Sequence, residues 1–355
     1  MKLKIHSAEL NRMMKTIVQC IDTRDMTGKA NISIVYDNGY LAIRATNGQV
    51  SAVMTTPLLG GDGESFCVDG AMFARVCAMC NGEIEISTDE KNCTIRGAGR
   101  TRLPIVNAKI PAFEQTAGDI IKMDGEQFSS MYSSVAHAIS ADQGRIVLTG
   151  VLIETDGREM SMVALDGFQM AVERALCYAE PMKVIVPGTF MKLISGSIQP
   201  SDTIRIITDG KKVQVSTQSM MLSCGLLAGE YPDYKRLLPT EFKTECVLDG
   251  DALRNALKSG SVVNNKNNLV KLKITENDLT LMSNSEQADY EAEVPCITQG
   301  NDMTIAFNQK YLANTIGSIN SNDLVLKFNG PTLPCIAQRK NGDGMRLVLP
   351  VRTVG

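Results

Sequence analysis

The sequence predicts an α+β protein of three tandem domains, each with two helices packed on antiparallel sheets. Two observations support this prediction. One strand–helix pattern occurs three times at similar spacing, and the alternating apolar runs between the helices are interrupted by turn dipeptides. The pattern is broken near residues 119 and 242, by PAFEQTAGD and LPTEFKTE. We therefore expect domains at residues 1–119, 120–242 and 243–355.

A strand that runs into an amphipathic helix opens each predicted domain, in the segments 4–17, 122–135 and 247–260. The apolar stripe of the first helix recurs with the 3.6-residue period of an α-helix, at Leu10, Met13, Ile17, Val18 and Ile21. The equivalent positions at the end of the strand are Ile5, Met123 and Leu248, and those at the start of the stripe are Leu10, Phe128 and Leu253. We expect these positions to be buried.

A second strand–helix pair follows in each domain, in the segments 67–87, 185–207 and 306–328. The three copies lie about 120 residues apart, which is the size of one ordinary domain. The equivalent strand positions are Val68, Val186 and Phe307, and the helix positions five residues later are Phe73, Met191 and Leu312. Each domain is therefore predicted to contain two helices.

Antiparallel hairpins are predicted between these helices. Asn38-Gly39 divides the alternating run 31–46, and Asp156-Gly157 divides the run 150–165. Both dipeptides favour the tight turns that join neighbouring antiparallel strands. The sheets are therefore expected to be antiparallel.

Composition limits the kinds of partner that the chain can hold. The formal net charge is −3 and the isoelectric point is near 5.6, which argues against one large basic surface that grips nucleic acid. The first residues, MKLKIHSAEL, show no secretion signal, and we find no apolar stretch long enough to cross a bilayer. We expect a soluble cytoplasmic protein.

The ten cysteines do not suggest a disulfide framework or a metal centre. Most stand singly within apolar runs, which is typical of reduced, buried thiols. Cys77 and Cys80 have CxxC spacing, but there is no second CxxC, and the two histidines, His6 and His137, are remote in sequence. We favour core packing over a metal or redox role for this pair.

Catalysis has no supporting pattern in the sequence. We find no phosphate-binding GxxxxGK[ST] loop, no GxSxG elbow and no cluster of metal ligands. Carboxylate pairs such as Asp142 and Glu154 remain open but have no motif around them. We therefore expect a protein that is not an enzyme and needs no cofactor.

Three tandem sheet domains leave an exposed strand edge at each end of the chain, and such edges invite association. Pairing of the last domain with the first domain of a second chain would remove both edges in a closed dimer. An open monomer whose edges are protected by charge is the alternative. The repeat alone does not decide between the two.

Five segments in order resemble the bacterial DNA sliding clamps, the β subunits of the replicative polymerase. LAGEYPDYKRLLP at 227–239 resembles the clamp motif near the end of the middle domain. The others are DQGRIVLTGVLIE at 142–154, LDGFQMA at 165–171, IVPG at 185–188 and RLVLPVRT at 346–353. The resemblance extends over the whole chain and includes the threefold repeat.

This resemblance implies a head-to-tail homodimer in which two chains close a six-domain ring around duplex DNA. Helices line the hole, and contact with DNA is independent of base sequence. The implied partners are the catalytic subunit of the replicative polymerase, the clamp loader and other proteins that carry a clamp-binding peptide. The alternative is a non-catalytic repeat scaffold that binds peptides without encircling DNA.

Basic residues on the polar faces of the predicted helices are the candidates for contact with DNA. They are sparse, which suits weak binding because each phosphate contact adds affinity. Arg24 and Arg100 lie outside the helices, and for Arg100, which alternates with Arg96 and Arg102, a basic strand face is an equally good explanation. The candidate set is Arg12, Lys15, Arg24, Arg75, Arg100, Lys192, Arg254, Lys258 and Lys310.

A pocket for partner peptides is implied by the same resemblance, between the second and third domains. It has apolar anchor positions and a basic rim, as peptide recognition requires. The matching residues are Arg145, Leu148, Leu165, Gly167, Met170, Pro232, Arg236, Leu237, Leu347, Leu349, Pro350, Val351 and Arg352. Clamps commonly have Thr-Asp-x-x-Arg-Leu-Ala where this sequence has LDGFQMA, so we expect a more apolar pocket with a shifted peptide preference. The resemblance also places Leu103 and Val262 at the joint between the two chains.

Overall fold

The computed structural model describes residues 2–22, 30–63, 65–263 and 268–352. The chain forms two compact units. The first unit contains residues 1–129 and 189–226, and the second contains residues 130–188 and 227–355. Helices α3 (Gly125–Val135) and α4 (Gly188–Ser197) each contribute residues to both units.

A five-stranded antiparallel sheet begins the first unit, in the order β5-β1-β7-β8-β9. Strand β9 is an edge of this sheet, and within the described residues it pairs only with β8. The strands are β1 (Lys2–His6), β5 (Gly60–Asp62), β7 (Glu83–Thr88), β8 (Asn92–Arg96) and β9 (Arg100–Pro104).

An eight-stranded antiparallel sheet completes the first unit, in the order β10-β15-β16-β17-β4-β3-β2-β6. Met220 of β17 pairs with Met54 of β4, so the sheet joins strands of the first repeat to strands of the second. The strands are β2 (Asn31–Asp37), β3 (Tyr40–Thr46), β4 (Val50–Pro57), β6 (Phe66–Asp69), β10 (Asp119–Asp124), β15 (Thr203–Thr208), β16 (Lys212–Ser216) and β17 (Met220–Gly225).

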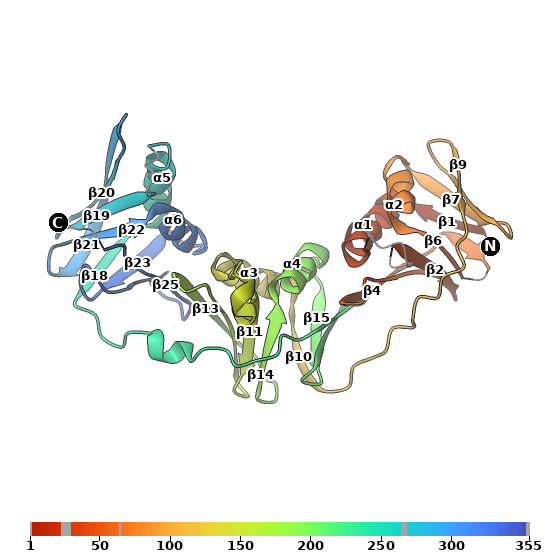
Figure 1. The fold of residues 1–355 in the computed structure, drawn as a ribbon, viewed down its shortest axis with the longest axis horizontal. Helices are drawn as coiled ribbons and strands as arrows, with labels where there is room; N and C mark the ends of the chain where they lie inside the picture. Colours follow the sequence, from red (N-terminus) through yellow and green to blue (C-terminus); the bar gives the residue numbers. More distant parts are fainter. Residues whose placement is uncertain (1, 23–29, 64, 264–267, 353–355) are drawn as a thin grey trace. The chain divides into compact units, whose positions relative to one another are not determined.

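Helices α1 (Ser7–Ile17) and α2 (Gly70–Ala78) lie beside each other in the first unit (Figure 1). The short 3-10 helix η1 (Val18–Cys20) extends α1. Asp69 caps α2, because its carboxylate accepts a hydrogen bond from the Met72 N–H at 2.7 Å. A buried hydrogen bond from Thr16 Oγ1 to Ser197 Oγ, at 2.9 Å, joins α1 to α4.

A single twelve-stranded antiparallel sheet runs through the second unit, in the order β14-β11-β12-β13-β25-β24-β23-β18-β21-β20-β19-β22. The β13–β25 pair joins strands of the second repeat to strands of the third. The strands are β11 (Gly150–Thr155), β12 (Glu159–Leu165), β13 (Gln169–Leu176), β14 (Met182–Pro187), β18 (Thr244–Asp249), β19 (Leu269–Ile274), β20 (Asp278–Asn284), β21 (Asp289–Gly300), β22 (Met303–Asn308), β23 (Asp323–Phe328), β24 (Cys335–Arg339) and β25 (Met345–Val348).

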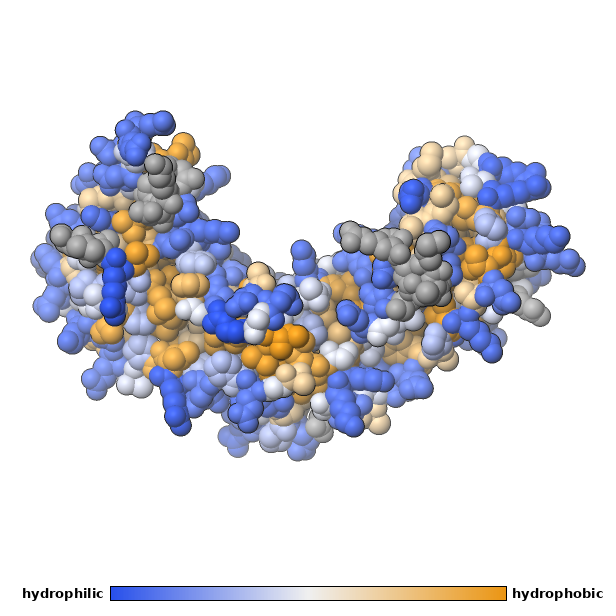
Figure 2. Space-filling view, in the orientation of Figure 1, coloured by the Kyte–Doolittle hydropathy of each residue, from blue (hydrophilic) through white to orange (hydrophobic). Residues whose placement is uncertain are grey.

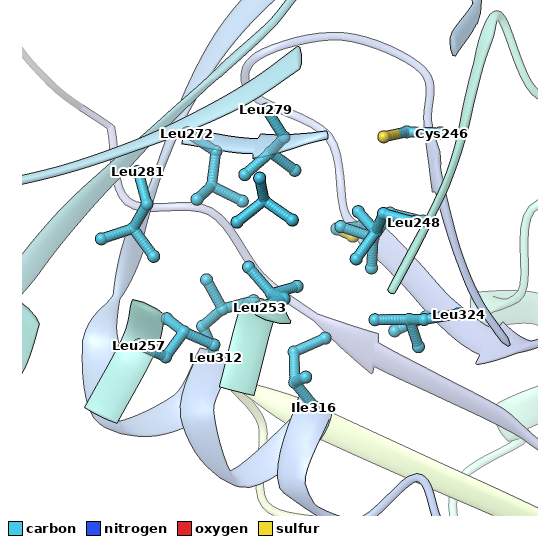
Figure 3. Packing of buried hydrophobic residues seen from close by; sticks show 14 of the residues in the cluster. Cys246, Leu248, Leu253, Leu257, Leu272, Leu279, Leu281, Leu312, Ile316 and Leu324 are labelled. Atoms are coloured by element: carbon cyan, nitrogen blue, oxygen red, sulfur yellow. The ribbon is translucent and has the colours of Figure 1, made fainter. Parts of the chain in front are cut away.

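Helices α5 (Gly250–Gly260) and α6 (Gln309–Gly317) lie beside each other on one side of this sheet (Figure 1). Leu253, Leu257, Leu312 and Ile316 point from the two helices into an apolar core with strand residues such as Leu272 (Figure 3). Three 3-10 helices lie in the loops: η2 (Ala136–Ala138), η3 (Gln143–Thr149) and η4 (Tyr234–Leu237).

The structure confirms the repeated strand–helix pattern and the α+β class. In each of the four sets of three residues that the sequence marks as equivalent, the residues lie at the same place in their elements, and all twelve positions are buried. The Asn38-Gly39 turn is also confirmed: both residues have positive φ angles, 46° and 86°, and they join β2 to β3.

The division into two compact units cuts through the predicted middle domain. It does so because β17 pairs with β4 and β13 pairs with β25, so each half of that domain continues a neighbouring sheet. The two domain boundaries, at 119 and 242, stay a prediction. None of the helices in the described ranges is long and apolar enough to cross a membrane.

Candidate nucleic-acid interface and partner site

Five of the six helices carry the predicted basic residues, and α3 carries none. Lys15, Arg75, Lys192, Lys258 and Lys310 are exposed. Figure 2 shows hydrophilic side chains over much of the visible face of each unit, with apolar residues between them. The polar faces of the helices therefore carry few basic residues. The remaining candidate Arg24 lies outside the described residues.

Lys15 of α1 and Lys258 of α5 occupy equivalent places, each five residues after the first apolar position of its helix. Both side chains are exposed, and neither forms an ion pair with a residue that the structure describes. Their ammonium groups are free to meet an external anion. Arg100 is exposed on the edge strand β9.

Two of the predicted arginines are held within the protein. Arg12 pairs with Glu9 at 3.0 Å. Arg254 pairs with Asp251 at 2.8 Å and also donates to the carbonyl oxygens of Ile319 and Ser321, each at 3.0 Å. Arg254 therefore fastens α5 to the loop after α6, and its contact with DNA stays a prediction.

Four predicted pocket residues belong to one apolar cluster of the second unit. Leu148, Leu165, Met170 and Leu347 pack together with Tyr231 and Tyr234 of the segment 227–239. Met170 lies directly opposite Leu165 on β12 and Leu347 on β25. The structure thus brings together residues that are almost 200 positions apart in the sequence.

The rim of this cluster is built on the turn before β13. Gly167 has a φ angle of +98°, and a Cβ atom there would lie 3.1 Å from Nη1 of Arg145. The guanidinium of Arg145 is held by Asp142 at 3.1 Å and by the carbonyl oxygen of Asp166 at 3.2 Å. A glycine at 167 therefore provides both the backbone conformation and the space for the arginine.

Residues 349–351 lie across the same turn. The Leu349 N–H donates to the carbonyl oxygen of Phe168 at 2.9 Å, and the Val351 N–H donates to that of Ala306 at 2.8 Å. Pro350 forms an isolated bridge with Phe307. Leu349 and Val351 are exposed, as are the predicted pocket residues Pro232, Leu237 and Arg352. Arg236 is exposed and pairs with Asp233 at 2.9 Å.

Two further apolar residues at the rim were not in the predicted set. Phe168 is 53% exposed, and its ring stacks on Tyr311 of α6 with centroids 5.3 Å apart. Ile146 is 52% exposed in η3. An aromatic residue at the tip of a DGF turn, where polar residues are usual, is the sequence signal that points to Phe168.

Tyr234 fastens the segment 227–239 to β11. Its hydroxyl donates to Glu154 at 2.5 Å, and Lys235 pairs with the same carboxylate at 2.9 Å. Burial raises the pKa of Tyr234, and its hydrogen bond to Glu154 raises that pKa further. Although burial opposes ionisation of Glu154, these two donors hold the pKa of its carboxyl below the usual range. The Tyr234 phenol therefore stays protonated and the Glu154 carboxyl stays ionised, as the hydrogen bond between them requires.

The predicted joint residues lie in different units. Leu103 of β9 is buried and lines a cavity of about 370 Å³ with Met72, Arg75 and Pro104. Val262, just after α5, is 84% exposed. Among the described residues, no group of histidines, cysteines or carboxylates could hold a metal ion. Cys77 and Cys80 are buried free thiols.

Two consecutive family models match this chain. The central domain of the DNA polymerase III beta subunit matches residues 122–233, and its C-terminal domain matches residues 235–352. The chain belongs to the DNA polymerase III beta subunit family. The matched ranges meet inside the segment 227–239, close to the tyrosines that fasten it.

Relatives and solved structures agree with this family. The chain is 26% identical over 346 residues to the beta sliding clamp of Streptomyces coelicolor, covering 92% of each, and 24% identical to that of Staphylococcus epidermidis. In the latter comparison 97% of this chain and 96% of the relative are covered. The Thermotoga maritima beta subunit superposes with a TM-score of 0.90 at 24% identity, over 99% of this chain and 100% of that one.

A Pseudomonas aeruginosa sliding clamp bound to griselimycin superposes with a TM-score of 0.92 at 20% identity, with the same coverage of the two chains. At these identities the structural likeness establishes the fold. The family membership rests on the two matched domains.

Proposed function

We propose that this chain is a DNA sliding clamp: two copies close a ring around duplex DNA and tether the replicative polymerase through a peptide pocket. The observation that carries the proposal is the threefold strand–helix repeat in a family whose named relatives are beta sliding clamps. The clamp itself needs no catalytic group in this role. The clamp loader and other peptide-bearing proteins are further partners.

The weakness of the basic helix faces supports sliding over tight binding. Lys15 and Lys258 are free, whereas Arg12 and Arg254 are partly neutralised by Glu9 and Asp251. Each phosphate that a lysine neutralises releases a counterion and adds salt-dependent affinity without reading the bases. A few such contacts keep the duplex in place within the ring and still allow the ring to slide along it.

Charge complementarity between two strands supports closure of the ring by a second copy. Arg100 and Arg102 are exposed on the edge strand β9. Asp289, Glu291 and Glu293 are exposed along β21, a strand of the other unit. Residues 289–295 of β21 pair on one side with β20, and β18 pairs only with residues 296–300 of β21. The basic edge strand of one chain and this acidic strand of its partner attract each other, which disfavours contact between two basic or two acidic strands. Leu103 and Val262 would then supply apolar contacts at this joint.

Topology tests the proposed function. The protein is loaded onto nicked circular DNA with a clamp loader and ATP, and the circle is then cut once. A ring slides off the free ends, so we expect the protein to be lost from the DNA as the circles are cut. Protein that stays on the linear DNA at the level seen on the circle would contradict encirclement.

Reversal of two charges separates the clamp from a peptide-binding scaffold. In the variant Lys15→Glu with Lys258→Glu, we expect weaker binding to linear duplex DNA and less efficient loading onto nicked circles, because two phosphate contacts per chain become repulsive. The slope of log affinity against log salt should fall by about one per lysine. Binding of a clamp-binding peptide should not change. Unchanged DNA affinity and unchanged loading would favour the scaffold.

Truncation of Met170 tests the peptide pocket. Met170→Ala removes an apolar anchor at the centre of the cluster, and we expect the Kd for a clamp-binding peptide to rise about tenfold or more. Fluorescence polarisation of a labelled peptide measures this. Met160→Ala is the matched control, since Met160 is equally buried on β12 but lies outside the cluster. Equal Kd values for Met170→Ala and the unchanged protein would place the pocket elsewhere.

A further inference from the structure

A strap of the first unit covers one face of the eight-stranded sheet. Residues 105–118 join β9 to β10 without forming a helix or strand (Figure 1). The Val106 N–H donates to the carbonyl oxygen of Cys67 at 2.9 Å, and the Thr116 N–H donates to Oε1 of Gln214 at 2.8 Å. Between these two anchors, the N–H groups of residues 109, 110 and 112–115 donate no hydrogen bond to any residue that the structure describes, and Pro111 has no N–H group.

A cavity of about 530 Å³ lies between the strap and the sheet. Val53 of β4 lines it from the sheet, and Ile110, Pro111 and Phe113 line it from the strap. Hydroxyl-bearing residues from three strands, among them Thr46 and Ser223, complete the wall. The cavity therefore offers an apolar side and a hydrogen-bonding side, as sites for small molecules do.

Arg44 of β3 lines this cavity and has no partner among the residues that the structure describes. Its Nε atom is buried and makes no hydrogen bond, and the side chain forms no ion pair with a described residue. Arg44 also lines a second cavity, of about 930 Å³, which Ile110 of the strap shares. A buried donor without an acceptor is unfavourable, and more so when it is charged. A bound acceptor would remove that cost.

Charges of both signs line the two cavities that Arg44 reaches, with Asp209 and Glu114 at the first and Asp89 and Glu90 at the second, but none of these four carboxylates pairs with Arg44. Lys212 lines the first cavity and adds a second positive charge. Oδ1 of Asp209 accepts hydrogen bonds from the N–H groups of Lys211 and Lys212, at 2.9 and 2.8 Å. These bonds hold the pKa of Asp209 low and keep its carboxylate at the turn. Glu114 of the strap also lines the cavity, but its side chain is exposed.

We propose that this cavity is a binding site for a small amphipathic carboxylate. The carboxylate pairs with the guanidinium of Arg44, for which a two-oxygen acceptor is the matching geometry. The apolar body of the molecule lies against Val53, Ile110 and Phe113. Such a ligand touches both the sheet and the strap, so it ties the strap down between its two anchors. This site is independent of the DNA and peptide surfaces of the proposed clamp.

Binding of N-acetyl-L-phenylalanine to the full chain tests this site, with its carboxamide and inorganic phosphate as comparison probes. For a molecule of this size we expect a Kd of about 1 mM, measured from the NMR signal of the Arg44 Nε–H group. Hydrogen exchange of the backbone amides of residues 109, 110 and 112–115 should slow on binding. The carboxamide should bind at least about tenfold more weakly, since it lacks the charge.

Two variants link the binding to Arg44. We expect Arg44→Gln to abolish the slowing of hydrogen exchange. Arg44→Lys should keep only part of the affinity, because lysine retains the charge but cannot donate to both carboxylate oxygens as the planar guanidinium does. The melting temperature of each variant shows that the fold is intact. Any one of four results would overturn the proposal. The carboxamide or inorganic phosphate could bind as tightly as the acid. Arg44→Gln could bind the acid as tightly as the unchanged protein, or the acid could fail to bind at 10-fold above the expected Kd.

Discussion

Replacement of Arg346 by methionine is expected to lower the free energy of unfolding by about 3–5 kcal/mol, measured by urea denaturation. Arg346 is 2% exposed, and its Nη2 lies 2.5 Å from Oε2 of Glu173, which is also buried. Its other nitrogens donate to the carbonyl oxygen of Val172 at 3.1 Å and to Oγ of Ser318 at 3.3 Å. Methionine fills a similar volume but leaves the Glu173 carboxylate with Arg339 as its one remaining cationic partner in the described residues.

A double-mutant cycle shows whether the pair, and not lost packing, causes the effect. Glu173→Leu combined with Arg346→Met removes both buried charges, so the double variant should be more stable than the Arg346→Met variant. Lys327→Met is a control for an ion pair of the same unit, since Lys327 pairs with Glu245, which is partly exposed. This variant should lower the free energy of unfolding by at most about 1 kcal/mol. Additive single effects would mean that the two buried charges do not depend on each other.

The position of this ion pair also connects it to the peptide pocket. Arg346 lies opposite Ala171 in the same β13–β25 ladder in which Leu347 lies opposite Met170. The pair therefore holds together the two strands that carry these anchors. It also reaches Ser318, just after α6, and so fastens the helix of the third repeat to strands of the second. Loss of Arg346 should weaken peptide binding as well as the fold.

The local features of the fold could be predicted because their signals lie within a few residues. The apolar stripe that begins at Leu10 marks α1, and the Asn38-Gly39 dipeptide marks the β2–β3 turn. Helix α2 begins directly after Asp69, whose side chain caps it. In each case a period or a turn preference that a short segment carries by itself specifies the structure.

The continuous sheets could not be predicted in this way. Met54 and Met220 pair across the first two repeats, and Met170 and Leu347 pair across the last two. Nothing within either segment specifies a partner so distant in sequence. The same limit applies to Arg346, which lies in the apolar run RLVLP and has its partner Glu173 more than 170 residues away.

The candidate site was predictable in part. From the residues alone, Leu148, Leu165 and Leu347 look like core, and the structure shows that they are indeed mostly buried. Resemblance to the clamps was needed to suggest that a partner reaches them, and that role stays a prediction. Arg254 shows the opposite limit, because a basic residue on a helix looks solvent-facing until the carbonyl groups of Ile319 and Ser321 are known to lie beside it.

His137 illustrates how burial sets the chemistry of a polar residue. It lies in η2 after α3, and neither ring nitrogen, Nδ1 or Nε2, has a hydrogen-bond partner in the described part of the chain. Burial lowers the pKa of His137 to about 4, and the positive charge of Arg346 lowers it in the same direction. The folded protein therefore keeps a neutral imidazole at pH values where an unfolded chain binds a proton.

The pH dependence of stability should show this difference. In the unfolded chain the pKa of a histidine is about 6.5, so between pH 6.5 and 4 the unfolded state binds a proton that the folded state excludes. Stability is then lost as the pH falls, by about 2 kcal/mol between pH 7 and 5, before most carboxylates titrate. Urea midpoints at fixed protein concentration measure this loss. In His137→Phe the loss over this range should largely vanish, whereas His6→Gln, at an exposed site, should retain it. The same loss in His137→Phe as in the unchanged protein would show that another group takes up the proton.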